Sequence, residues 1–323
     1  MMVEIMAEKE KIMKATRDGY GDGLIEIGSR NNNVVALDAD LAKSTRSIQF
    51  GKKFPDRFRY IGISEADLVA TAAGLAFSGK IAYASTFAEF LTARAFDQIR
   101  MSVCYSNANV KLVGSHGGLL TGSDGPSAQA ILDLSLMRTM PNMKVVFPAD
   151  AVEARKATVL IGEIDGPCYM RTCREKTPVF FDENHSIKLG KAKVMKEGKD
   201  VTLFSTGPIL AESLEAAEML KKEKVDAAVV HVPWLKPFDE KTIVDYAKKT
   251  GRVVSIEDHT IIGALGSAIA ETLSEHYPTP LRRVGVKDMF GESGSPKDLY
   301  RKYGLDADAI SKKALELMKE VRK

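Results

Sequence analysis

Short apolar runs alternate with longer amphipathic stretches through the first half of this 323-residue chain. Runs that are apolar on both faces are typical of parallel strands covered by helices on two sides. The expected strands are 34–38, 59–63, 81–85, 110–115, 144–147 and 168–171. The expected helices between them are 5–29, 65–77, 87–105, 127–140 and 151–161. This alternation predicts a doubly wound α/β domain over residues 1–176, with its site at the carboxyl ends of the strands.

The pattern stops at a charged segment that contains Pro178 and has no regular period, which we interpret as a linker over residues 177–199. A second α/β pattern follows over residues 200–323. Its expected strands are 201–205, 227–232, 252–256 and 282–286, and its expected helices are 208–222, 239–249, 263–276 and 307–321. The predicted fold class is therefore α/β, with two doubly wound domains and mainly parallel sheets.

Composition excludes several classes of protein. The 46 basic and 43 acidic side chains leave a net charge of +3, too small to indicate binding to nucleic acid or to an anionic membrane. No apolar run approaches the roughly 20 residues that a membrane span requires. Three cysteines without CxxC spacing, and a charged start instead of a secretory signal, predict a cytoplasmic protein.

One motif resembles a metal site without having its spacing. Gly21-Asp22-Gly23 followed by Asn31 to Asn33 is similar to the GDG…NN signature that holds magnesium diphosphate in thiamine enzymes, but only seven residues separate the two parts. The GDG also falls within a predicted amphipathic helix. We therefore expect a helix here, and no metal site.

Polar residues at predicted strand ends form the first candidate cluster. Glu65 follows Ser64, a plausible helix N-cap, so it is either a first-turn carboxylate that complements the helix dipole or a carboxyl directed into a cleft. Phe87 and Phe90 lie three residues apart at the start of the next predicted helix. Aromatic residues at this spacing are usually core residues.

A glycine-rich loop follows the strand that ends at Ser115. Residues 114–126 contain five glycines and a proline, a composition that lets backbone approach a ligand closely. His116 and Asp124 are its candidate functional side chains. Taken alone, the loop would be interpreted as a surface loop with a solvated histidine.

Taken in order, these segments resemble the C-terminal half of transketolase, over nearly the whole chain. The matching motifs are GISEADL (62–68), YASTF (83–87), SHGGLLTGSDGP (115–126), PADAVE (148–153), MRTCR (170–174) and EDH (257–259) followed by Gly263, Gly266 and Ser267. The resemblance implies a pyrimidine-binding (Pyr) domain followed by a transketolase C-terminal domain.

The resemblance also implies that the cofactor is thiamine diphosphate. Glu65 matches the glutamate that shares a proton with N1′ of the aminopyrimidine and so favours the imino form that deprotonates the thiazolium. Burial against the cofactor favours such proton sharing, whereas the helix N-terminus favours the anion. Phe87 and Phe90 match the aromatic residues that pack the pyrimidine ring, and Asp40 matches an aspartate close to the cofactor.

No diphosphate-binding (PP) domain is recognisable in the sequence. The resemblance therefore implies a split enzyme, in which an N-terminal transketolase subunit supplies the PP domain and holds Mg²⁺ and the diphosphate. We expect a homodimeric core of this chain within an α2β2 assembly.

Five further matches imply a clamp for sugar phosphates. Arg17, Ser44, His116 and Arg174 match residues that bind the phosphate and hydroxyl groups, and Asp124 matches an acceptor for a substrate hydroxyl. Guanidinium groups suit phosphate oxygens because their planar donors bind two oxygens at once.

Two departures from the family pattern concern the acceptor pocket. Ser123 stands where many members have glutamate, and Ala128 where bacterial members have a second histidine. Three functions follow as hypotheses. The first is transfer of a two-carbon ketol unit from a ketose phosphate to an aldose phosphate, and the second is a deoxyxylulose-phosphate synthase or 2-oxo acid dehydrogenase β subunit. The third is a noncatalytic assembly subunit of the same fold.

Overall fold

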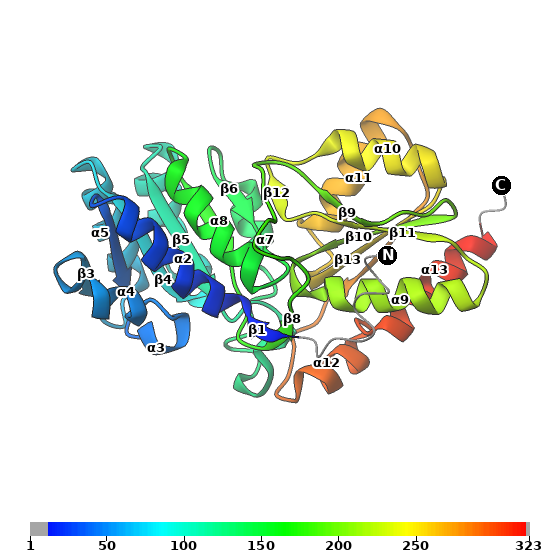
Figure 1. Ribbon diagram of the computed structural model, residues 1–323, viewed down its shortest axis with the longest axis horizontal. Helices are drawn as coiled ribbons and strands as arrows, with labels where there is room; N and C mark the ends of the chain where they lie inside the picture. The colour runs from blue at the N-terminus through cyan, green and yellow to red at the C-terminus, as the bar shows by residue number, and fades with distance from the viewer. Residues whose placement is uncertain (1–11, 321–323) are drawn as a thin grey trace.

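The computed structural model describes residues 12–320 and contains two α/β units side by side, each built on its own sheet (Figure 1). The strands of the first unit are β1 (Met13–Ala15), β2 (Val34–Asp38), β3 (Phe58–Tyr60), β4 (Ile81–Phe87), β5 (Val110–Ser115), β6 (Lys144–Val146), β7 (Cys168–Arg171) and β8 (Lys176–Pro178). Its helices are α2 (Thr16–Arg30), α3 (Ala42–Thr45), α4 (Ile48–Lys53), α5 (Glu65–Phe77), α6 (Phe96–Gln98), α7 (Asp133–Thr139) and α8 (Ala151–Glu163). Two π-helices, η2 (Phe90–Arg94) and η3 (Ile99–Tyr105), flank α6, and a 3₁₀ helix, η4 (Leu119–Asp124), follows β5.

The second unit begins at β9 (Lys193–Lys196). Its other strands are β10 (Val201–Thr206), β11 (Ala227–His231), β12 (Trp234–Lys236), β13 (Val253–Thr260) and β14 (Leu281–Val286). Its helices are α9 (Leu210–Lys222), α10 (Glu240–Thr250), α11 (Leu265–His276), α12 (Pro296–Tyr303) and α13 (Ala307–Glu320).

The first sheet has the strand order β12-β6-β7-β5-β4-β2-β3, and every neighbouring pair except β12–β6 is parallel. Alternate residues of its strands enter two different cores. Leu37, Ala84 and Leu112 pack toward α5, whereas Ala36 and Val113 pack toward α2 and α8. Because both faces are covered, the sheet brings the carboxyl ends of β2, β4, β5 and β7 together along one edge.

The second sheet has the order β14-β13-β10-β11-β9 and is parallel apart from β9. Helices α10 and α11 lie on one side of it, and α9 and α13 on the other (Figure 1). The predicted fold class, two mainly parallel α/β units, is confirmed.

The GDG segment is helical, as predicted. Gly19 and Gly23 lie in α2 where it crosses α8, and an added Cβ atom would lie 2.0 Å from the Ala151 carbonyl oxygen and 2.5 Å from that of Arg155. The glycines therefore serve close packing of the two helices. Asp22 is bound in an ion pair with Lys14, 2.6 Å away.

Several predicted elements differ from the structure. The predicted helix 87–105 is divided, because Phe87 ends β4 and η2, α6 and η3 follow it. In the predicted helix 5–29, residues 5–11 lie outside the described residues, and residues 13–15 form β1, which pairs with β8, so the helix begins at Thr16. The predicted helix 127–140 is helical only from Asp133, because the Ala130 carbonyl accepts bonds from Gly118 N and from Arg171. In the predicted linker, β9 pairs with β11.

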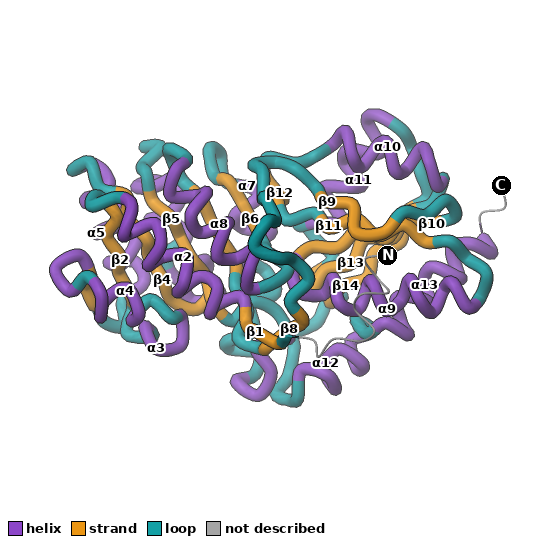
Figure 2. Tube along the Cα trace, viewed as in Figure 1, coloured by secondary structure: helices purple, strands orange, loops and turns teal. Residues whose placement is uncertain are grey.

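The two units are joined through main chain and side chains. Strand β12 leaves the second unit and pairs antiparallel with β6 at the edge of the first sheet (Figure 2). Glu153, the third residue of α8, is fully buried and accepts hydrogen bonds from His231 on β11 (2.8 Å) and from His185 (3.2 Å). These contacts fix the position of β6 and α8 of the first unit relative to the second unit.

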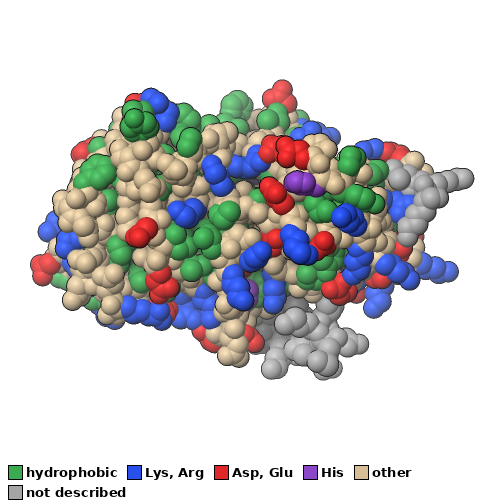
Figure 3. All heavy atoms as spheres, turned by 90° about the horizontal axis from the view of Figure 1, so that it is seen from above, with side chains coloured by type: hydrophobic (Ala, Val, Ile, Leu, Met, Phe, Trp, Pro, Cys, Tyr) green, Lys and Arg blue, Asp and Glu red, His purple; other side chains and the backbone are tan. Residues whose placement is uncertain are grey.

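Charges of both signs are mixed on the face seen in Figure 3, where Lys and Arg side chains lie among Asp and Glu. This mixture agrees with the small net charge of the sequence. Among residues 12–320, no helix is both long and apolar enough to span a bilayer.

Candidate functional site

Four strands of the first sheet end beside one another and deliver most of the predicted site residues. Asp40 follows β2, Phe87 ends β4, His116 follows β5, and Arg174 follows β7. The parallel pairing of β2 with β4, β4 with β5 and β5 with β7 fixes this arrangement. The edge is the usual ligand-binding edge of a doubly wound sheet.

Glu65 is the first residue of α5, and its side chain is only 5% exposed. Its Oε1 atom accepts a hydrogen bond from Nη1 of Arg94 at 2.9 Å. The guanidinium of Arg94 also lies over the ring of Phe90, 4.0 Å from the centroid. The carboxyl, the guanidinium and the aromatic ring thus form one contact group.

Phe87 connects this group to the glycine-rich loop. Its ring lies 5.5 Å from that of Phe90, with an angle of 24° between the ring planes, and stacks on the imidazole of His116 at 3.7 Å. Phe87 and Phe90 are both partly exposed, which is unusual for rings that serve only as core residues. The structure therefore presents a partly open aromatic surface next to a buried carboxyl.

His116 is 2% exposed and has a φ of +63°, a left-handed conformation that non-glycine residues adopt rarely. Ser115 Oγ lies 3.0 Å from its Nδ1, and Thr121 Oγ1 donates to its carbonyl at 2.7 Å. Burial, with the positive charges of Arg17 and Arg174, lowers the pKa of His116 to about 3. The imidazole is consequently neutral at neutral pH.

The charged residues of the predicted clamp lie around His116. Asp124 Oδ1 accepts from Arg174 at 2.5 Å, and its other oxygen lies 3.8 Å from His116 Nε2. Arg17 donates to the Ser44 carbonyl at 3.0 Å, and its buried Nε has no hydrogen-bond partner among the described residues. Burial, and after it the charge of Arg46, lower the pKa of Arg17. This set offers guanidinium donors to an anionic ligand.

The second unit holds the loop in place. The carboxylate of Asp258, on β13, accepts hydrogen bonds from the backbone N–H groups of Leu119 (2.8 Å) and Leu120 (3.2 Å). Gly118 allows this approach, because an added Cβ would lie 2.2 Å from that carboxylate and the residue has a φ of +70°. The loop conformation thus depends on a residue 139 positions beyond Leu119 in sequence.

The structure separates Asp40 from the other polar residues of its turn. Asp40 is exposed, with a φ of +66°. Asp38, two residues earlier, is fully buried and organises the turn by accepting from Leu41 N (2.6 Å), Thr45 Oγ1 (2.7 Å) and Ser47 Oγ (2.8 Å). Ser44 lies inside the turn that Asp38 holds.

The Asp38 carboxyl gives a prediction on pH. Burial raises its pKa from 3.8 to about 6, so the folded chain binds a proton that the unfolded chain releases. The resulting stabilisation is complete below about pH 4 and is lost as the pH rises through about 6, at most about 3 kcal/mol. In urea unfolding at a series of pH values, Asp38→Asn should gain stability relative to the wild type over this range. If the free energies of unfolding of Asp38→Asn and the wild type change with pH in the same way, this assignment is contradicted. Asp56→Asn, at an exposed position, is the control.

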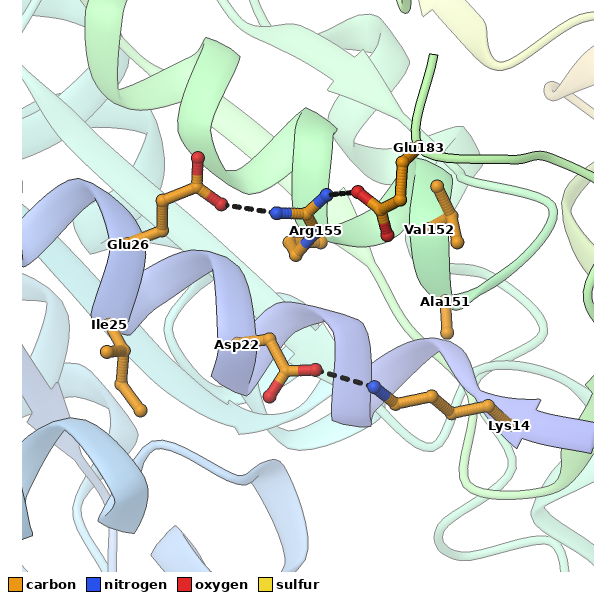
Figure 4. A pocket seen from close by; sticks show the side chains of 8 residues that line it. All are labelled: Lys14, Asp22, Ile25, Glu26, Ala151, Val152, Arg155 and Glu183. Carbon is orange, nitrogen blue, oxygen red and sulfur yellow. Dashed lines mark hydrogen bonds and ion pairs between the residues drawn. The ribbon is translucent and has the colours of Figure 1, made fainter. Parts of the chain in front are cut away.

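A shallow hollow of about 380 Å³ lies elsewhere, between α2, α8 and the segment around Glu183 (Figure 4). Its charged side chains are already paired with one another: Lys14 with Asp22, and Arg155 with both Glu26 and Glu183. The lining of this hollow includes none of the residues at the carboxyl ends of β2, β4, β5 and β7, so we do not assign the site to it.

The residues at the strand edge fit a flat heteroaromatic group. The buried carboxyl of Glu65, which Arg94 contacts through one oxygen, can accept from a ring nitrogen, and two partly exposed phenylalanine rings lie nearby. The aminopyrimidine of thiamine diphosphate has this chemistry. Among residues 12–320 no group of three or more acidic, His or Cys side chains is arranged to hold a metal ion.

Sequence reasoning missed three residues of this region. Arg94 could have been found from its i,i+4 spacing to Phe90, which places a cation near an aromatic ring on one helix. Asp38 reads as the end of a buried strand, and nothing local marks its carboxyl as a hydrogen-bond acceptor. Asp258 belongs to a matched motif, but its contact with the loop depends on tertiary structure.

Comparison with protein families gives two matches. The pyrimidine binding domain of transketolase matches residues 13–179, and the C-terminal domain of transketolase matches residues 190–310.

Three relatives and one solved structure are similar over most of the chain. The putative transketolase C-terminal section of Methanocaldococcus jannaschii is 40% identical over 98% of this chain and 100% of its own length. A 6-deoxy-6-sulfo-D-fructose transketolase subunit of a Clostridium species is 42% identical over 93% of this chain and 94% of its own length. The transketolase of Homo sapiens is 39% identical over 92% of this chain but only 48% of its own length. A structure described as a split gene transketolase, inactive beta4 tetramer, has a TM-score of 0.89 at 47% identity and covers 95% of this chain and 99% of that one.

Proposed function

Since the chain belongs to the transketolase family and carries its pyrimidine-binding and C-terminal domains, we propose that it is the C-terminal subunit of a split transketolase. In this proposal it transfers a two-carbon ketol unit from a ketose phosphate to an aldose phosphate. The observation that carries the proposal is the continuous line of contacts from Glu65 through Arg94, Phe90, Phe87 and His116 to Asp124.

The cofactor end of this line is Glu65 with the two phenylalanines. Thiamine diphosphate, when bound, supplies the carbanion chemistry, and the protein positions and polarises it. Glu65 is proposed to hold a proton between its carboxyl and the pyrimidine N1′. Phe87 and Phe90 are proposed to fix the plane of the ring, and Asp40 is proposed to lie at the rim of the same pocket.

The substrate end is the charged group around His116. Arg17 and Arg174 are proposed to bind the phosphate, with Ser44 beside Arg17. His116, being neutral, is proposed to donate or accept a hydrogen bond with a substrate hydroxyl, and Asp124 to accept another. The ion pair of Asp124 with Arg174 keeps both side chains at the pocket before substrate arrives.

A second polypeptide is part of the proposal. The chain spans 48% of the human transketolase that it matches, and the split relative of known structure is described as inactive when it forms a beta4 tetramer. We propose that an N-terminal subunit supplies the PP domain and Mg²⁺, and that the working enzyme is an α2β2 assembly.

A mixing assay tests the proposed function. The chain alone should show no ketol transfer from xylulose 5-phosphate to ribose 5-phosphate. Addition of the PP-domain subunit, thiamine diphosphate and Mg²⁺ should give transfer that depends on all three. Activity of the chain alone would refute the split arrangement.

The same assay distinguishes the alternative functions by their donors. Activity only with pyruvate would assign the chain to the deoxyxylulose-phosphate synthase or 2-oxo acid dehydrogenase type. A complex that assembles but transfers nothing from any donor would indicate a noncatalytic subunit. 6-Deoxy-6-sulfo-D-fructose belongs in the donor panel, because a subunit 42% identical to this chain is named for it.

A further inference from the structure

Arg94 is half-exposed, yet it contacts both a buried carboxyl and an aromatic ring. Its side chain is 51% exposed, yet one nitrogen lies 2.9 Å from the buried carboxyl of Glu65, and its guanidinium carbon lies 4.0 Å from the centre of the Phe90 ring. Glu65 and Phe90 are the acid and one of the two aromatic residues of the proposed pyrimidine pocket. Arg94 therefore lies at this pocket, on the element that also carries Phe90.

The backbone explains why the guanidinium reaches this position. Phe90 and Arg94 are the ends of the π-helix η2, a wide turn that is rare in proteins and is often found at functional sites. Thr92, between them, donates to the Ala88 carbonyl at 2.8 Å. The turn places both ends of the segment on the side of Glu65.

The guanidinium has the chemical character of the group that we expect in the pocket. It is planar, it donates hydrogen bonds, and it stacks on aromatic rings. A protonated aminopyrimidine has the same three properties, and it would use the same carboxyl and the same aromatic surface. The two groups therefore compete for Glu65 and Phe90.

We propose that Arg94 is a positioning residue that holds Glu65 in the unliganded pocket and that thiamine diphosphate must displace in order to bind. This inference rests on the proposed function, and it adds a determinant of cofactor affinity. Before binding, Arg94 keeps a partner on a carboxyl that would otherwise be buried alone. On binding, the cofactor takes over that partnership and the guanidinium moves toward solvent.

The expected size of the effect follows from the two contacts that are exchanged. The ion pair joins a buried carboxyl to a half-exposed guanidinium, and solvent on the guanidinium side weakens it. A cation–π contact of a half-exposed guanidinium is also weak. If Arg94 closes the pocket in part of the molecules, the apparent dissociation constant of the cofactor equals the intrinsic one divided by the fraction of open pockets. We therefore expect removal of the guanidinium to tighten cofactor binding on the order of three- to tenfold.

Calorimetric titration of the assembled enzyme with thiamine diphosphate, at saturating Mg²⁺, measures this effect directly as a dissociation constant. Arg94→Gln should bind on the order of three- to tenfold more tightly than the wild type, and Arg94→Lys should fall between them because it keeps the charge without the planar donors. Raising the salt concentration should tighten binding by the wild type more than by Arg94→Gln, since salt weakens the ion pair at its half-exposed guanidinium.

Arg100→Gln is the matched control, because Arg100 is exposed on η3 and pairs with Asp97 at 2.6 Å. Its dissociation constant should equal that of the wild type. Weaker or unchanged binding by Arg94→Gln would overturn the inference and leave the proposed function intact. Failure of the wild-type assembly to bind thiamine diphosphate would overturn both.

Discussion

Replacement of Glu65 by glutamine is expected to lower the turnover number of the assembled enzyme by about 10²- to 10⁴-fold, the usual contribution of a group that transfers a proton in the reaction. The amide keeps the shape of the side chain and still forms hydrogen bonds, but it cannot share a proton with a ring nitrogen. Steady-state ketol transfer with the PP-domain subunit, at saturating cofactor, measures the loss. Turnover equal to that of the wild type would contradict the role proposed for Glu65.

Asp67→Asn is the control for this experiment. Asp67 lies on the same helix, α5, but is exposed, and its carboxylate accepts a hydrogen bond from Thr71 at 3.1 Å. We expect its turnover to match the wild type. Thermal unfolding of both variants, and their assembly with the partner subunit, show whether a change in turnover arises from the catalytic step or from altered stability or assembly.

The second large effect is expected at Arg171, which has no exposed side-chain surface and lies where the two units meet. Nη2 donates to the carbonyls of Ala130 (2.7 Å) and Asp258 (3.0 Å), and Nε lies 3.6 Å from the Asp133 carboxylate. Arg171→Met keeps much of the volume but removes these partners. Because buried acceptors and a buried carboxylate then lose their cation, the free energy of unfolding should fall by about 3–5 kcal/mol.

Urea unfolding followed by circular dichroism measures this loss. Arg301→Met, on the exposed side of α12, should change the free energy of unfolding by no more than about 0.5 kcal/mol. Arg171→Lys keeps the charge on a shorter side chain without the planar set of donors, so an intermediate loss is expected. A loss below about 1 kcal/mol in Arg171→Met would show that the contacts at the junction contribute little.

The parts of the fold that the sequence predicts well are those with a strong local pattern. β2, β5 and β7, together with α5, have the predicted bounds because each is an apolar run or a small-residue helix bounded by turn residues. The strands β9 and β12 were missed because both are short, and pairing with distant strands determines them. The division into residues 1–176, 177–199 and 200–323 stays a prediction.

For the candidate site, the resemblance to transketolase identified residues that the structure brings together. Physical reasoning from the sequence alone could not have identified them. Phe87, His116 and Asp124 lie in contact or nearly so because adjacent parallel strands end together. The partners of these residues were not predictable in the same way. The i,i+4 spacing of Arg94 to Phe90 is visible in the sequence, but the contact of Arg94 with Glu65 is not, and Asp258 reaches its loop only when the second unit is packed on the first.

The antiparallel strand β12 has a consequence for where such a protein can be divided. It covers the outer edge of β6, and without it that edge would present unpaired N–H and C=O groups to other molecules. A truncation after residue 176 would therefore leave the edge of β6 unpaired, and the fragment 1–176 would tend to self-associate through it. A break upstream of β1 would leave this pairing intact, so the fold favours division before β1 over division between its own two units.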